Sequence, residues 1–147
     1  MPAPLLIDAC RTYLIAQGIV RDPRTAGAAA PCWRSPREGV PAPGDGTGNE
    51  IGATAVVGLF TAAGIARDPY DALSLRTDGL DIRIRSTTAP AAIELDDLMR
   101  GALMDKRAWT MGGLTIVESR LERPLQMIQS SEQGFDFLSG WLFERSA

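Results

Sequence analysis

Two segments repeat apolar residues at the spacing of an amphipathic helix, and this feature most constrains what the chain can fold into. The first segment is defined by five residues on one helical face: Leu6, Ala9, Cys10, Tyr13 and Leu14. Pro4 suits the first turn of a helix and Gly18 suits the position after the last turn. We therefore expect a helix over Leu5 to Gln17, with Cys10 as a small core residue.

The second segment repeats the same spacing, with an apolar face made of Leu95, Leu98, Met99, Ala102 and Leu103. Thr88 is a good N-cap residue, and Pro90 follows in the first turn. The sequence therefore predicts a second helix from about Ala89 to Lys106.

Four other segments have the patterns of β-strands. Leu80 to Arg85 alternates apolar and charged residues, which predicts a strand with one face on the core and one polar face. An apolar run from Ala53 to Ala62 precedes it. Leu114 to Leu125 and Phe135 to Arg145 follow the second helix, and the last carries an aromatic stripe at period two.

The order of these elements is helix, strand, strand, helix, strand, strand. Two amphipathic helices can cover one face of a sheet, so we expect an α+β fold. The expected sheet is about four-stranded and mostly antiparallel, with both helices packed on one face. The length of 147 residues favours a single domain over residues 1–147.

The segment 21–50 follows neither period, because ten of its thirty residues are Pro or Gly. A long segment of this kind is usually a functional loop or is disordered. We expect a long loop or arm after the first helix. Trp33 stands within it, and it either pins the loop to its own domain or packs on a neighbouring molecule.

The face of the predicted sheet that the helices leave uncovered carries charges of both signs. These residues and Trp33 form the candidate assembly interface: Trp33, Asp81, Arg83, Arg85, Glu118, Arg120 and Glu122. A solvated surface is the alternative reading for any single charge among them.

The chain contains no histidine, which removes Ser-His-Asp and Cys-His catalytic pairs and every metal site that needs histidine. Cys10 and Cys32 lie in different segments and are too few for a zinc site or a disulfide scaffold. The glycines of residues 44–48 lack the Lys and the strand–helix context of a phosphate loop. We expect no catalytic, cofactor-binding or metal-binding residue and no enzyme activity. Asp96 and Asp97 are adjacent on the predicted helix and so diverge, and Glu118 and Glu122 lie beside Arg120, which favours solvated ion pairs. A hydrolase that uses only carboxylates stays open.

Charge and hydropathy bear on partners and location. The net charge of −3 argues weakly against strong nucleic-acid binding. No secretory signal and no apolar stretch of about 18 residues is present, so we expect no membrane association. Reduced thiols in a cytoplasmic setting are the expectation for the two cysteines.

The chain from Leu5 to Glu144 resembles a tail terminator, or a closely related neck protein, of long-tailed bacteriophages. The resemblance rests on the opening helix, the long Pro/Gly loop, and the strand Leu80–Arg85 that leads through Thr87–Pro90 into a Leu-rich helix. It continues with segments in the second half of the chain: Met111–Arg120, Arg123–Gln126, Gln133–Phe137, and Phe143 with Glu144.

This resemblance implies a structural virion protein of the head–tail neck, made in the host cytoplasm. It implies a homo-oligomeric ring, usually a hexamer, that ends the tail tube and joins it to the head connector. Its partners would be copies of itself, the tail tube protein and the head-completion or connector protein, and DNA would pass through the lumen as cargo. The family has no strict catalytic motif, so the resemblance assigns no active-site residue.

Three other readings stay open. One is a head-completion or stopper protein of the same neck, which the sequence separates poorly from a terminator. Another is a small α+β module that binds a ligand or regulates a partner. The third is the carboxylate-only hydrolase named above.

Overall fold

The structure is a computed structural model that describes residues 5–25, 27–34, 43, 55–61, 75–104, 106–131 and 134–146. Within these ranges the chain forms two helices and seven strands. In chain order they are α1 (Leu6–Ala16), β1 (Val20–Arg21), β2 (Ala30–Arg34), β3 (Ala55–Thr61), β4 (Leu75–Ser86), α2 (Ala89–Leu103), β5 (Lys106–Met111), β6 (Leu114–Ser131) and β7 (Gly134–Ser146).

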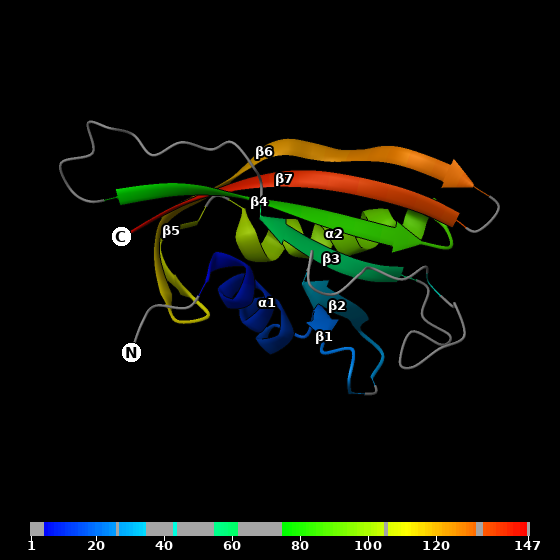
Figure 1. The fold of residues 1–147 in the computed structure, drawn as a ribbon, viewed down its shortest axis with the longest axis horizontal. Coiled ribbons are helices and arrows are strands. Elements are labelled where there is room, and N and C mark those ends of the chain that lie inside the picture. The colour runs from blue at the N-terminus through cyan, green and yellow to red at the C-terminus, as the bar shows by residue number, and fades with distance from the viewer. Residues whose placement is uncertain are drawn as a thin grey trace.

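All seven strands belong to one mixed sheet with the order β1-β2-β3-β4-β7-β6-β5. β1, β2 and β3 pair in parallel, and the remaining neighbours pair antiparallel. The sheet is curved, with β4, β7 and β6 as its longest strands and both helices lying on its inner side (Figure 1). The expected sheet of about four strands, mostly antiparallel and with both helices packed on one face, is therefore wrong, because the sheet is a mixed, curled one of seven strands.

The extra strands lie where the sequence pattern was weakest. β1 ends at Arg21, the first residue of the segment 21–50, and β2 lies inside the segment, so its first part belongs to the sheet and is not only a loop. Residues 26, 35–42 and 44–50 of that predicted loop lie outside the described residues. Pro31 has no backbone N–H to donate to a neighbouring strand. β2 tolerates it because β1, the strand on one side of β2, pairs with β2 over only two residues.

β5 was missed because its first residues were assigned to the second helix and its last residues to a turn. α2 ends at Leu103, and Lys106, the expected last residue of the helix, is the first residue of β5. β5 and β6 are joined by Gly112 and Gly113, with φ of 53° and 94°. Two consecutive left-handed residues are the geometry of the tightest β-hairpin turns, which glycine adopts at low cost.

The core lies between the helices and the inner face of the sheet. α1 packs against β1 to β5, and α2 packs against β4 and β6. The largest fully buried side chains include Leu14, Ile82, Ile84, Trp141 and Phe143, so the helical face of α1 and the alternation of β4 are both used in the core. Thr88 caps α2, its side-chain oxygen accepting a hydrogen bond from the Ala91 amide at 3.4 Å.

Both cysteines are buried in this core as free thiols, Cys10 on α1 and Cys32 on β2. Burial raises the pKa of the Cys10 thiol far above its usual range, and the neighbouring Cys32 thiol raises it further. A thiol with so little thiolate is a poor nucleophile, which agrees with a packing role for Cys10.

Candidate functional site

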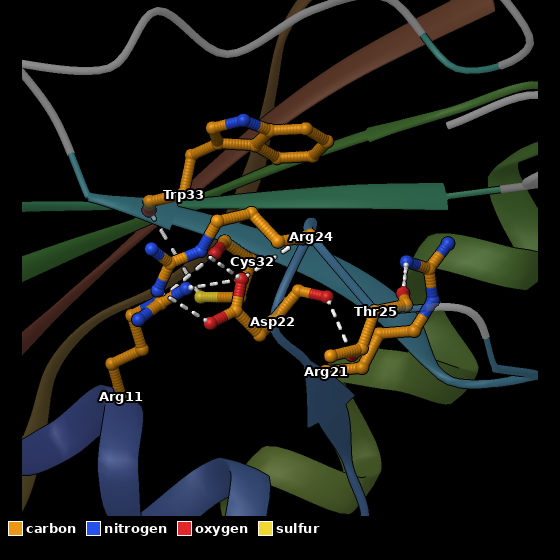
Figure 2. A network of polar contacts seen from close by, with 7 residues as sticks. All are labelled: Arg11, Arg21, Asp22, Arg24, Thr25, Cys32 and Trp33. Atoms are coloured by element: carbon orange, nitrogen blue, oxygen red, sulfur yellow. Dashed lines mark hydrogen bonds and ion pairs between the residues drawn. The ribbon is translucent and has the colours of Figure 1, made fainter. Parts of the chain in front are cut away.

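The register of the strands places most of the predicted interface residues on one face of the sheet. Trp33 on β2 lies opposite Gly58 on β3, and Gly58 lies opposite Arg83 on β4. Residues directly opposite each other project from the same face. Trp33 therefore shares a face with Arg83, although 50 residues separate them in the sequence. Figure 2 shows the Trp33 indole directed away from Arg11 of the inner helix α1.

The same face continues across β4, β7 and β6. Asp81 and Arg85 flank Arg83 at a spacing of two residues, and side chains two apart in a strand share a face. On β6, Glu118 lies opposite Glu144 and Arg120 opposite Leu142 of β7. We call this surface the outer face, and its predicted interface residues are Trp33, Asp81, Arg83, Arg85, Glu118 and Arg120. Glu122 is exposed, but the pairing of β6 shifts between Leu121 and Arg123, so the register assigns it no face.

Arg83 is neutralised within the chain by an aspartate that the sequence pattern did not identify. Its Nε lies 2.8 Å from Oδ1 of Asp136 on β7, and its terminal nitrogen contacts Oδ2. Asp136 is buried, with 6% of its surface exposed. The hydrogen bonds to Asp136 raise the pKa of the Arg83 guanidinium, an effect that its partial burial opposes.

Asp81 is neutralised in the same way from the other side of β7. The guanidinium of Arg123 on β6 reaches across Gly140 to the Asp81 carboxylate. A β-carbon at Gly140 would lie 2.5 Å from Nε of Arg123, so this crossing needs a residue without a side chain. Two of the six predicted residues on the outer face are therefore engaged in ion pairs that span strands.

Glu118, Arg120 and Glu122 differ from Asp81 and Arg83. Within the described part of the chain, none of the three has a charged partner within ion-pair distance. Arg120 and Glu122 are exposed, and Glu118 is half-buried beside Glu144. A small hollow there is lined by Thr77, Glu118, Arg120, Leu142 and Glu144. This end of the outer face therefore offers charges that a second molecule can pair.

A second polar cluster joins α1 to the connection between β1 and β2 (Figure 2). Asp22 accepts hydrogen bonds from the backbone amide of Arg24 at 2.9 Å and from its guanidinium at 2.9 and 3.2 Å. These bonds hold the pKa of the Asp22 carboxyl well below its usual range. Arg11 approaches Asp22 at 3.5 Å and donates to the Cys32 carbonyl at 3.0 Å.

This second cluster was not identified from the sequence, although Asp22-Pro23 is a recognisable turn signal. It borders a surface hollow of about 290 Å³ whose lining includes Asp8, Asp22, Trp33 and Arg34. Arg34 pairs with Asp8 at 2.5 Å. The guanidinium groups of this cluster already bond carboxylates and carbonyl groups of the same chain. We therefore assign the cluster a structural role, in which it holds the β1–β2 connection against α1.

A third cluster surrounds Lys106, the only lysine of the chain. Its ammonium group donates to the Tyr13 hydroxyl at 2.9 Å and lies 4.9 Å from the centre of the Trp109 ring. The Tyr13 hydroxyl donates in turn to the Ala102 carbonyl at 3.0 Å. This cluster ties α1, the end of α2 and β5 together.

The part of the chain that the structure describes contains no group of three or more metal-ligating side chains placed to hold an ion. In that same part, none of the helices has the length and apolar character needed to cross a membrane.

No known protein family and no curated protein matches this chain.

Proposed function

We propose that the protein is a structural subunit of the bacteriophage neck, which forms a ring that ends the tail tube and joins it to the head connector. In this proposal the subunits occupy the virion, DNA passes through the lumen of the ring, and no catalysis is required of any residue. The observation that carries it is the outer face, where side chains from four strands form one charged surface that neither helix covers.

The geometry of this face supports assembly in two ways. Asp81 and Arg83 are tied by ion pairs to β6 and β7, which fixes the strands relative to one another and keeps the surface rigid. Arg120 has no ion pair in the described part of the chain and is exposed, so a neighbour can complement it. A preorganised surface binds with less loss of conformational entropy than a mobile one.

The test measures the mass of the purified protein by light scattering across a wide concentration range, alone and with the tail tube protein. Negative-stain images of the same samples reveal whether the particles are rings. We expect a discrete oligomer that binds the end of the tail tube. A protein that stays monomeric at every concentration, also with the tail tube protein present, contradicts the proposal.

A matched pair of variants ties the result to the outer face. Arg120→Glu reverses the charge of an exposed residue on this face, and we expect it to weaken assembly or tail tube binding by at least about tenfold, since apposed like charges cost several kcal/mol and about 1.4 kcal/mol already corresponds to tenfold. Thr12→Glu adds a negative charge at an exposed position of α1, on the inner side of the sheet, and serves as the control. Equal effects of the two changes would remove the outer face from the proposal.

A further inference from the structure

Two polar atoms in the core, one on α2 and one on β7, are buried without a hydrogen-bond partner in the described part of the chain. They are Oδ1 of Asp96 and Oγ of Ser139. Asp96 has 4% of its surface exposed and Ser139 has 2%. Native proteins pair nearly all of their buried polar atoms, with protein groups or with ordered water, so these two atoms need an explanation.

α2 crosses β7 on the inner side of the sheet. Its N-terminal end is held at β4, where the Ser86 hydroxyl donates a hydrogen bond to the Thr88 carbonyl at 2.6 Å. Its C-terminal end is held at β6, where the Ser119 hydroxyl donates to the Leu103 carbonyl. Because β7 lies between β4 and β6 in the sheet, the middle of α2 passes over β7.

The strand register shows which part of β7 lies below the middle of the helix. Ser86 pairs with Phe135 of β7, and Ser119 pairs with Phe143. These two β7 residues are separated by roughly 26 Å of strand, and the helix is roughly 21 Å long, so the two lengths match closely. Ser139 is halfway between Phe135 and Phe143, and the centre of α2 therefore lies over Ser139.

Both side chains point into the layer between α2 and the sheet. Asp96 is the middle residue of α2 and belongs to its buried side, together with Ala92 and Met99. Ser139 pairs with Ile82, which is fully buried on the inner face of β4, and residues directly opposite each other share a face. Asp96 and Ser139 therefore face one another across this layer.

The two groups are complementary in chemistry, yet they do not bond to each other. Nε of Arg100 donates to Oδ2 of Asp96 at 2.9 Å, which leaves Oδ1 as an acceptor. The Ser139 hydroxyl can donate and accept. Trp141, two residues further along the same face of β7, adds an indole N–H donor that is also buried and without a partner in the described part of the chain.

An acceptor, a hydroxyl and a donor are the set of groups that one water molecule can satisfy, because a buried water typically makes about three hydrogen bonds. A metal ion is a poorer occupant. Ca²⁺ and Mg²⁺ take about six or more oxygen ligands, and Arg100 already neutralises the Asp96 carboxylate. An apolar ligand would leave all of these polar groups unpaired.

We propose that one water molecule binds between α2 and β7 and bridges Oδ1 of Asp96 to Oγ of Ser139. The water donates one hydrogen bond to the carboxylate and shares a second with the hydroxyl, and the Trp141 indole N–H is its third partner. This inference is independent of the proposed function, because the site lies inside the core of a single subunit.

A high-resolution crystal structure of the purified protein tests the site directly. We expect a density peak about 2.7–3.2 Å from both Oδ1 of Asp96 and Oγ of Ser139, which is the range of a hydrogen bond. A direct hydrogen bond between these two oxygens, or the absence of a peak between them, overturns the inference.

Magnetic relaxation dispersion of the water oxygen counts long-lived internal waters in solution. Ser139→Ala removes one anchor of the bridge, so we expect it to hold one such water fewer than the wild type. Ser119→Ala is the matched control, because it also removes a buried hydroxyl from the inner face, but that hydroxyl bonds the Leu103 carbonyl directly. An unchanged count in Ser139→Ala, or an equal loss in both variants, contradicts the bridge. If Ser139→Ala does not fold, the wild-type crystal structure decides.

Discussion

Gly112 lies in the turn between β5 and β6, directly against the backbone of α1. Its φ is 53°, in the left-handed region that other residues avoid. A β-carbon at this position would lie 2.7 Å from the Cα and 2.8 Å from the carbonyl carbon of Ala9, and closer still to the carbonyl oxygen. Because these neighbours are backbone atoms of a packed helix, Gly112→Ala forces α1 and the turn apart.

The cost of Gly112→Ala has two parts. The left-handed conformation costs a residue with a β-carbon about 1–2 kcal/mol. Forcing extra volume into a packed contact costs about 1–3 kcal/mol more. We therefore expect the free energy of unfolding to fall by about 2–5 kcal/mol, with the melting temperature dropping by about 2–4 °C for each kcal/mol.

Gly18→Ala is the matched control for this change. Gly18 has φ of 75°, but a β-carbon there would meet nothing within 4 Å. The control therefore contains only the backbone strain and should cost about 1–2 kcal/mol. Urea unfolding of the wild type and both variants, followed by circular dichroism, measures the difference. Equal losses for the two variants would refute the close contact between α1 and the β5–β6 turn.

Two further changes test polar contacts in the core. Tyr13→Phe leaves the Ala102 carbonyl and the Lys106 ammonium without their shared partner, so we expect thermal melting to reveal a loss of about 1–3 kcal/mol. Burial raises the pKa of Asp96 above its ordinary value of 3.8, an effect that Arg100 opposes. The folded state then keeps the proton to a higher pH than the unfolded state, so this group destabilises the fold as pH rises through that range. The side chain in Asp96→Asn cannot titrate. Urea unfolding at several pH values should therefore show the free energy of unfolding of Asp96→Asn rising relative to that of the wild type as pH increases. A difference between the two proteins that is the same at every pH would contradict the raised pKa of Asp96.

The helices were predictable because their signals are local. The apolar spacing of α1, the Thr88 cap of α2 and the left-handed Gly18 all depend on residues within one or two turns of each other. The end of α2 was the exception. β5 begins already at Lys106, whose ammonium group contacts Tyr13 of α1, and no local signal encodes that contact.

The number of strands was not predictable, because a short parallel strand is stabilised by its neighbours and not by its own pattern. β2 contains Pro31 and only five residues, yet Cys32 pairs opposite Val57 and is fully buried. A period-two search finds strands with one polar face, such as Leu80 to Arg85, and it misses strands held by pairing on both sides.

The candidate interface was predictable only in part, because the ion-pair partners of its residues come from strands that are distant in the sequence. Alternation on β4 identified Asp81 and Arg83 as residues of a polar face, but it could not identify their partners on β6 and β7. Asp136 and Arg123 are 53 and 42 residues away from their partners in the sequence, and only the register brings them together. Gly140 carried no readable signal, although its missing side chain lets Arg123 cross β7.

These partners change which charges a neighbouring molecule can meet. Disrupting the Arg83–Asp136 pair would leave the buried Asp136 carboxylate without its counter-charge, so a neighbour cannot recruit Arg83 without a cost to the fold. Arg120 is exposed and carries no such cost. Recognition by the outer face should therefore concentrate at the β6 end, where Arg120 lies. The set of charges that a neighbouring molecule can pair is then smaller than the alternating sequence pattern suggests. Arg120→Glu on β6 is therefore the most direct test of the interface.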